Sequence, residues 1–272
     1  MSHGDEGPER PPRFTATHRK IAAGVVLLEL ALAGVLVLSQ WSASRAPDSA
    51  PAPVATRPST VPLADFQSAA PSPDARLVAN WVVATRDHQD QAFILVDKKD
   101  AQVYVFHPDG RLRGSAPALL GAARGDRIVP GSEDKTPAQM KPEEKTTPAG
   151  RFVAKPGVNA DDEDVIWVDY DAAISMHRVR PRVRSEARLE RLASGADEDN
   201  RISYGCINLP VAFYENVARP TVDSYGAFIY VLPEESTPQE VVGAYDVTDP
   251  AQVAAARQAN VARATATVRQ TA

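Results

Sequence analysis

The sequence contains only one cysteine, Cys206. A single thiol excludes an intrachain disulfide framework and any zinc site that needs two thiolates. Positive charge is not in excess either, since the chain has 30 Lys and Arg residues but 35 Asp and Glu residues, which gives a net charge of −5. A protein that binds nucleic acid is therefore not expected. Aromatic residues are scarce at 6%, internal repeats are absent, and neither a metal ion nor a cofactor is expected.

Apolar residues are plentiful but unevenly placed. The 272 residues are 43% hydrophobic and 24% charged, which is typical of a globular protein with one or two domains. Residues 21–38 form an apolar run with one charge, Glu29, and reach the lower end of the length that spans a bilayer. Basic residues are more frequent before the run than after it, which places the N-terminus in the cytoplasm. We expect a cytoplasmic segment at 1–20 and a transmembrane signal-anchor helix at 21–41, with a cleaved signal peptide as the alternative.

The remainder of the chain divides by composition into three parts. Residues 42–75 are rich in Pro, Ala and Ser, which is typical of a disordered, extended linker. Globular patterning continues over 76–235 and predicts a folded domain. Residues 236–272 have few large apolar side chains and are expected to form a flexible or partly helical tail, with a helix near 250–260. The sequence does not indicate an oligomeric state.

The folded domain is predicted to be mostly β. Short apolar runs rich in β-branched and aromatic residues alternate with turn signals, which is the pattern of strands. Helical spacing is present only at 185–192 and 210–218, so one or two short helices are expected. The predicted strands are 92–96, 102–106, 165–168, 173–176 and 227–232.

Cys206 lies in a segment suited to nucleophilic chemistry. It follows Gly205 and precedes a predicted helix start, so its sulfur is expected on a tight turn where backbone N–H groups stabilise a thiolate or an oxyanion. A reactive thiolate also needs a partner, usually a histidine. Of the five histidines, two lie on the predicted cytoplasmic side, two lie in loops, and His177 ends a predicted strand. The residues alone leave open that Cys206 is a small buried side chain and His177 a surface residue.

Three segments resemble those of a known family. Residues 203–209, Ser-Tyr-Gly-Cys-Ile-Asn-Leu, resemble the signature of L,D-transpeptidase catalytic domains, which is Ser/Thr-His-Gly-Cys followed by an apolar residue and Asn or Arg. Residues 147–152, Thr-Pro-Ala-Gly-Arg-Phe, are similar to the family's Thr-Pro-x-Gly-x-Phe segment, and 174–177 resemble its histidine strand. The resemblance covers about residues 90–233 and implies a β-rich sandwich or barrel.

The resemblance also implies a chemistry. Cys206 would be the nucleophile and His177 the proton acceptor and donor, while Ser203, Gly205 and Asn208 would support the turn and the oxyanion site. The implied substrate is a peptidoglycan stem peptide, whose acyl group passes through a thioester to a second stem in a 3→3 cross-link. Such a transferase serves cell wall organisation and cell shape from the bacterial inner membrane, with its catalytic domain in the periplasm. The acceptor stays open between a stem amine, a protein lysine and water, and water would make the protein an L,D-carboxypeptidase or hydrolase.

This chain departs from the family pattern at three places. Tyr204 replaces the histidine of Ser-His-Gly-Cys, Arg178 replaces the glycine after the catalytic histidine, and the segment 178–202 is longer than usual. These departures keep a second hypothesis open, a catalytically inactive scaffold that binds the cell wall. A papain-like cysteine hydrolase is disfavoured, because His177 precedes Cys206 in this chain and the order is reversed in that family.

A basic stretch follows the candidate histidine. Arg178 and Arg180 are alternate residues of this stretch, and with Tyr204 they are candidates for substrate binding, because Arg pairs bidentately with carboxylates of the kind a stem peptide carries. The alternative is a solvated face. Two acidic clusters, 161–164 and 197–199, lack the spacing of a calcium loop and are expected to be solvated loops.

Overall fold

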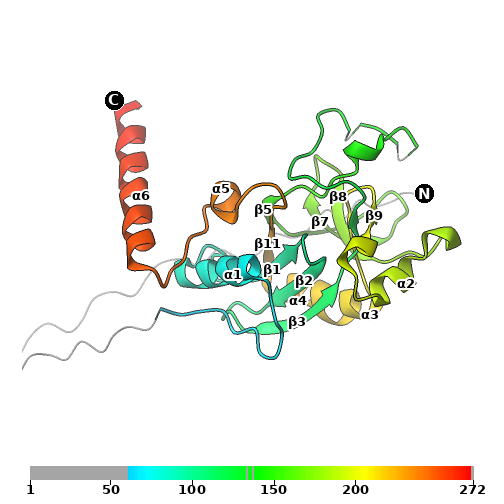
Figure 1. Ribbon diagram of the computed structural model, residues 1–272, viewed down its shortest axis with the longest axis horizontal. Helices are drawn as coiled ribbons and strands as arrows, with labels where there is room; N and C mark the ends of the chain where they lie inside the picture. Colours follow the sequence, from blue (N-terminus) through cyan, green and yellow to red (C-terminus); the bar gives the residue numbers. More distant parts are fainter. Residues whose placement is uncertain (1–60, 133, 137, 271–272) are drawn as a thin grey trace, which may run out of the picture. The chain divides into compact units, whose positions relative to one another are not determined.

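The computed structural model describes residues 61–132, 134–136 and 138–270 (Figure 1). The predicted cytoplasmic segment and membrane helix, and most of the predicted linker, lie outside these residues. Within them, no helix combines the length and the apolarity needed to cross a bilayer. The described part of the chain is mostly sheet with few helices, which confirms that the folded domain is β-rich.

Two sheets form the framework, and a two-stranded ladder of β4 (Leu120–Gly121) and β9 (Arg201–Ser203) adjoins them. The five strands predicted from the sequence are all present in these two sheets. In spatial order, the larger sheet contains β3 (Leu112–Pro117), β2 (Gln102–Phe106), β1 (Ala92–Asp97), β11 (Ala227–Val231) and β5 (Gly150–Val153). The smaller sheet contains β10 (Ile207–Leu209), β8 (Ile174–Arg178), β7 (Asp164–Asp169) and β6 (Lys155–Val158).

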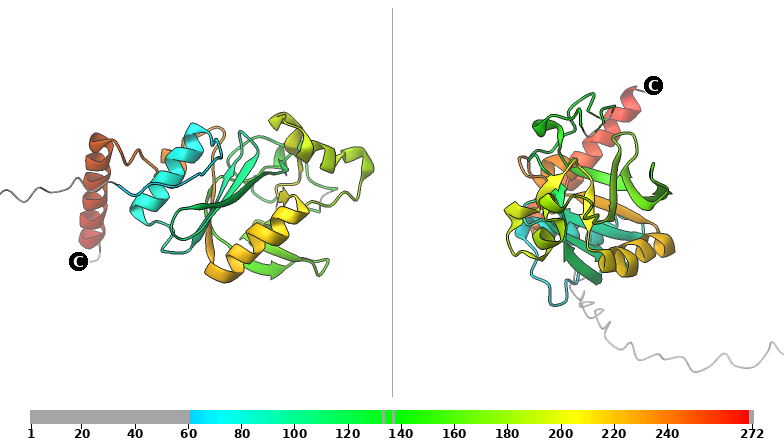
Figure 2. Two further views of the ribbon diagram at one scale, coloured as in Figure 1. Left: turned by 90° about the horizontal axis from the view of Figure 1, so that it is seen from below. Right: turned by 90° about the vertical axis from the view of Figure 1, so that its right-hand side faces the viewer.

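The central strands of the larger sheet are buried on both faces. Successive side chains of a strand point to opposite faces, so each central strand contributes to two cores. In β1, Ile94 packs into a core shared with the smaller sheet, whereas Phe93 and Leu95 pack against α1 (Pro73–Thr85). Figure 2 shows α1 and α4 (Arg219–Tyr225) on opposite sides of these strands. Burial on both faces explains the continuous apolar runs that the sequence shows there.

Helix α1 was not predicted from the sequence, and it begins inside the predicted linker. The hydroxyl of Ser72 caps it by accepting the N–H of Ala75 at 3.1 Å, and Pro73 occupies the first turn, where no donor is lost. Phe66 is also buried in the core on the α1 side. The predicted linker boundary at residue 75 therefore falls inside a packed helix, because six buried residues of α1 outweigh the Pro- and Ala-rich composition around it.

The described residues contain more helix than the one or two short helices expected. The predicted helix at 210–218 runs through a π-helical turn (Tyr214–Ala218) and continues as α4 to Tyr225. The tail is partly packed, since Ala244 and Val247 are buried in the α1-side core, and its predicted helix begins at Pro250 and reaches Gln270. Besides α1 and α4, the α-helices of the described residues are α2 (Arg188–Ala193), α3 (Val211–Phe213), α5 (Pro238–Val242) and α6 (Pro250–Gln270). Of these, α3 is the first turn of the helix predicted at 210–218, and α6 is the helix of the tail. Short 3₁₀ turns cover Pro142–Glu144, Arg184–Glu186 and Asp197–Asn200.

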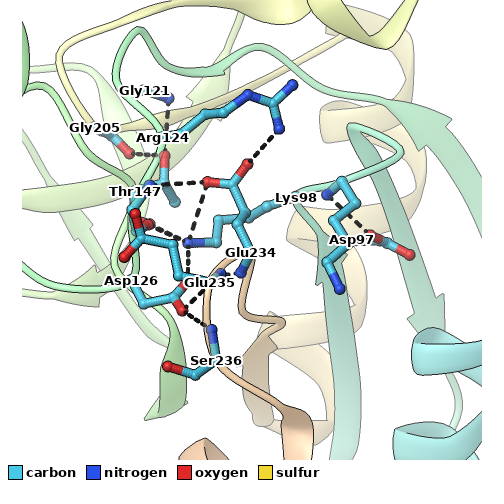
Figure 3. Close-up of polar contacts among 12 residues, drawn as sticks. Asp97, Lys98, Gly121, Arg124, Asp126, Thr147, Gly205, Glu234, Glu235 and Ser236 are labelled. Carbon is cyan, nitrogen blue, oxygen red and sulfur yellow. Dashed lines mark hydrogen bonds and ion pairs between the residues drawn. The ribbon is translucent and has the colours of Figure 1, made fainter.

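A buried ammonium group joins the end of β1 to distant segments (Figure 3). Lys98 is fully buried, and its Nζ donates to the carbonyl oxygens of Gly125 at 2.6 Å and Thr147 at 2.9 Å, and to Asp126 Oδ1 at 3.0 Å. Glu234, just after β11, lies 3.6 Å from the same nitrogen. Burial would raise the pKa of the Asp126 carboxyl, but the amides of Glu234 and Ser236 and the Lys98 ammonium hold that pKa well below its usual range.

We predict that Lys98→Met lowers the free energy of unfolding of the full-length chain by about 3 kcal/mol, because it leaves Asp126 and Glu234 buried without their ammonium partner. Urea unfolding measures the change. Lys99→Met is the matched control, since Lys99 is an exposed neighbour whose ion pair with Asp74 should contribute less than about 1 kcal/mol. Equal losses in the two variants would contradict the structural role of the buried ammonium.

Candidate active site

Strand pairing brings the cysteine and the histidine to one surface. The neighbouring strands β8 and β10 are parallel, with His177 opposite Asn208 and Met176 opposite Ile207. Met176 and Ile207 are both buried in the core between the sheets. Because side chains alternate along a strand, the flanking residues face the other way. Ser175, His177, Cys206 and Asn208 therefore share the face turned away from this core.

The thiol of Cys206 is half-buried among polar groups. Its Sγ lies 3.6 Å from Ser175 Oγ and 3.7 Å from the carbonyl oxygen of Ala173. Burial raises the pKa of the thiol, but a hydrogen bond with His177, the charge of that ring and hydrogen bonds with Ser175 together bring the pKa below its ordinary value. A lowered pKa favours the thiolate, which is the nucleophilic form of cysteine.

The imidazole of His177 has a defined orientation. Its Nδ1 lies 2.7 Å from the carbonyl oxygen of Arg178. A carbonyl oxygen only accepts hydrogen bonds, so Nδ1 carries the proton in this contact. In the neutral ring, Nε2 is then left with its lone pair. This tautomer suits a group that accepts a proton from a thiol.

The turn before Cys206 is held by hydrogen bonds within the segment. Ser203 Oγ accepts the N–H of Gly205 at 3.1 Å and donates to the carbonyl oxygen of Cys206 at 2.6 Å. Asn208 Nδ2 donates to the same carbonyl oxygen at 3.2 Å. Gly205 has a φ of +127°, and a Cβ there would lie 2.8 Å from the carbonyl oxygen of Thr146, so only glycine fits. Ser203, Gly205 and Asn208 thus form the turn on which Cys206 sits.

Three further residues take part in the site, although sequence reasoning gave them no role. Ser175 contacts the thiol, and the only signal for it was its place two residues before His177 in a predicted strand. Thr147 Oγ1 donates to the carbonyl oxygen of Gly205 at 2.8 Å. Arg188 Nη1 donates to Asn208 Oδ1 at 2.8 Å. These last two contacts join segments that are distant in sequence, so residue spacing gave no signal for them.

Tyr204 faces outward from the turn. Its side chain is 39% exposed, and its ring lies 4.7 Å from the ammonium nitrogen of Lys145 in a cation–π contact. The ring therefore borders the turn from the solvent side. With tyrosine at this position, His177 still lowers the pKa of the Cys206 thiol.

The basic stretch and the acidic cluster pair with each other. Arg178 forms ion pairs with Asp164 and Glu215 and stacks on the ring of Tyr214 at 4.6 Å. The cluster at 161–164 leaves Asp161 and Asp162 exposed, as expected for a solvated loop, and it also provides partners for the arginines. Arg180 and Arg182 both pair with Asp161 and Glu163.

Of the two arginines proposed for substrate binding, Arg180 lies within electrostatic reach of the thiol. Burial and the charge of Arg182 lower the pKa of the Arg180 guanidinium, whereas the negative charges of Asp161 and of the Cys206 thiolate act in the opposite direction. Arg178 is instead held by its two carboxylate partners, and its pKa is raised mainly by the hydrogen bond to Glu215. The two candidates therefore have different surroundings.

Comparison with known proteins gives matches among solved structures only, since no protein-family model and no curated protein match the sequence. The helical cell shape determining protein Pgp2 from Campylobacter jejuni is 18% identical with a TM-score of 0.36, and the match covers 55% of this chain and 50% of that chain. The catalytic domain of the Enterococcus faecium L,D-transpeptidase is 17% identical with a TM-score of 0.30, covering 53% of this chain and 98% of that domain.

A third match is the L,D-transpeptidase from Mycobacterium smegmatis, which is 19% identical with a TM-score of 0.29, covering 52% of this chain and 58% of that chain. This chain thus spans about half the length of the Campylobacter protein. These three structural neighbours are two L,D-transpeptidases and Pgp2, all at low identity. Identities and TM-scores this low leave the chemistry of the site to be decided from the contacts of Cys206 and its neighbours.

We predict that Cys206 is alkylated by iodoacetamide at a lower pH than an ordinary cysteine, and that His177→Ala slows the reaction about tenfold at pH 7. The physical reason is that His177 lowers the pKa of the thiol, so its removal raises that pKa. At a pH below the pKa, each unit by which the pKa rises reduces the thiolate fraction about tenfold. Intact-mass measurement across a pH series gives the rates without background, because Cys206 is the only cysteine. His107→Ala, in the turn between β2 and β3, is the control. Identical pH profiles for His177→Ala and the unchanged chain would contradict the prediction.

Proposed function

We propose that this chain is a cysteine-dependent L,D-transpeptidase that acts on peptidoglycan stem peptides. The observation that carries the proposal is the thiol of Cys206, which lies 3.6 Å from Ser175 Oγ on the face that it shares with His177, and whose pKa is lowered by that histidine. The resemblance of residues 203–209 and 147–152 to the family's segments supplies the substrate class. We further propose that residues 21–41 anchor the chain in the bacterial inner membrane, with the catalytic domain in the periplasm and a role in cell shape.

The first half of the reaction is acylation. Nε2 of His177 takes the proton of the thiol, and the sulfur attacks the carbonyl carbon of the third stem residue. The carbonyl electron pair moves to the oxygen, giving a tetrahedral oxyanion that backbone N–H donors stabilise. When the electron pair returns, the bond to the terminal D-Ala breaks, and the imidazolium gives its proton to the leaving amine. The product is a thioester on Cys206.

The second half of the reaction repeats these steps in reverse order. The amine of a second stem attacks the thioester carbonyl, and His177 takes a proton from that amine. The carbon–sulfur bond then breaks, and the proton returns to the sulfur. A 3→3 cross-link leaves the site, and the thiol is regenerated. Water in place of the amine would give a tripeptide stem, which is the carboxypeptidase outcome.

To test the proposal, the full-length chain is incubated with a disaccharide tetrapeptide, and separately with a carbapenem, and analysed by intact-mass spectrometry. We expect an acyl adduct on Cys206, release of D-Ala, and a product mass that distinguishes cross-linking from hydrolysis. Cys206→Ala should abolish both the adduct and the release. His177→Ala should slow acylation by about 100-fold, the usual contribution of a general base.

The opposite result defines the rival hypothesis. A folded chain that forms no adduct and releases no D-Ala would contradict the enzyme proposal and favour the inactive wall-binding scaffold. Circular dichroism establishes folding in the same samples. Cys206→Ala then serves a second purpose, because a scaffold should bind intact peptidoglycan equally well with and without the thiol.

We also predict that Arg180 contributes to substrate binding. Arg180→Gln should raise the KM for the tetrapeptide about tenfold with little change in kcat, because it removes a charge-assisted contact to a stem carboxylate near the thiol. Arg182→Gln is the matched control, since Arg182 pairs with the same two carboxylates but its side chain is 62% exposed. A rise in KM of the same size in both variants would assign the effect to general charge and contradict the prediction.

A further inference from the structure

A buried hydroxyl group lies between two backbone groups behind the candidate nucleophile. The side chain of Thr147 is almost fully buried. Its Oγ1 lies 2.9 Å from the amide nitrogen of Gly121 and 2.8 Å from the carbonyl oxygen of Gly205 (Figure 3). An amide N–H only donates, so the hydroxyl accepts from Gly121, and its single proton is directed to the carbonyl oxygen of Gly205.

This contact sets the orientation of one peptide bond. The carbonyl of Gly205 and the N–H of Cys206 belong to the same planar peptide unit, and no cis peptide occurs in the described part of the chain. In a trans peptide, the two groups point in opposite directions. When Thr147 holds the carbonyl on the buried side, the N–H of Cys206 is turned away from that side.

The N–H of Cys206 is also a spare donor. Outside the strand ladders, it donates to no other group in the described part of the chain. The neighbouring N–H of Gly205 is already used, because it donates to Ser203 Oγ at 3.1 Å. The turn therefore keeps one donor unpaired on the nucleophile itself, while the donor beside it is satisfied.

From this geometry we propose that Thr147 is a positioning residue, which aims the N–H of Cys206 at the oxyanion formed during acylation. The inference rests on the proposed acyl-transfer function and assigns a role to a residue that does not touch the substrate. Without the hydroxyl, the carbonyl of Gly205 would be buried without a donor, and rotation of the peptide would be favoured. Such a rotation would turn the N–H of Cys206 away from the reacting carbonyl.

The surroundings of Thr147 keep it fixed. Its own carbonyl oxygen accepts from the buried ammonium of Lys98 at 2.9 Å. Gly121 and Gly205 both lie against the backbone of residues 145–147, and neither position has room for a Cβ. A Cβ at Gly121 would lie 2.3 Å from the carbonyl oxygen of Lys145, and a Cβ at Gly205 would lie 2.8 Å from the carbonyl oxygen of Thr146. Two glycines and one buried cation therefore define the place of a single hydroxyl.

The test compares Thr147→Val, which removes the hydroxyl at constant shape, with Thr147→Ser, which retains it. Two reactions of the full-length chain are followed by intact mass. Acylation by p-nitrophenyl acetate forms a carbon–sulfur bond, passes through an oxyanion and expels p-nitrophenolate. Alkylation by iodoacetamide forms a carbon–sulfur bond and expels iodide without an oxyanion.

We expect Thr147→Val to slow acylation about tenfold or more, in line with the loss of an oxyanion donor. Alkylation should change less than about twofold, because the thiolate and His177 are untouched. Thr147→Ser should restore acylation. A purely structural role would slow both reactions together, and that result would overturn the inference, as would unchanged acylation in Thr147→Val.

The proposed function and the role of Thr147 are tested by different measurements, release of D-Ala for the first and acylation by the ester for the second. If the unchanged chain is acylated by the ester but releases no D-Ala from the tetrapeptide, the substrate proposal fails while the ester comparison still tests Thr147. If the unchanged chain is acylated no faster than free cysteine at equal thiolate fraction, it has no oxyanion site and the inference is wrong. Failure of the proposed function can therefore be distinguished from failure of the inference about Thr147.

Discussion

The buried ammonium of Lys98 is the interaction on which the arrangement of the site depends. A buried charge is costly unless it is paired and hydrogen-bonded. Lys98 satisfies this condition only when the end of β1, the loop at Gly125 and Asp126, the segment at Thr147 and the end of β11 come together. Its three donors reach Gly125, Asp126 and Thr147, so a shift of either of these two segments leaves at least one donor unpaired. The position of Thr147, and through it the turn of Cys206, follows from this requirement.

Much of the face that carries His177 and Cys206 could be predicted from the sequence, because it depends on local patterns. A strand ending at His177 and a glycine turn before Cys206 are both visible in the order of residues. Alternation along β8 and β10 then places the two side chains on the face opposite the core. What local patterns did not predict is that β10 is the strand that pairs with β8. That information is not local, since 29 positions separate the two residues.

The features that escaped prediction all depend on contacts between distant segments. Thr147 was part of a recognised segment, but its partner Gly205 lies 58 residues further on. The sequence around Lys98 gave no sign that this lysine is buried, because its burial results from the packing of four segments. Helix α1 was hidden by a Pro- and Ala-rich composition that its burial against the sheet outweighs. In each case tertiary packing, rather than propensity, decided the structure.

The long segment 178–202 belongs to the candidate site, because it fixes the peptide bond on the carboxyl side of Cys206. Arg188, paired with Glu186, holds the amide oxygen of Asn208, whose amide nitrogen donates to the carbonyl oxygen of Cys206. Thr147 holds the peptide on the amino side of Cys206, and this chain of contacts holds the peptide on its carboxyl side. With both peptides fixed, rotation about the Cα–Cβ bond is the main freedom left to the thiol. In the proposed acyl transfer, a sulfur restricted in this way needs little reorganisation as charge develops, which is how a preorganised site lowers a barrier.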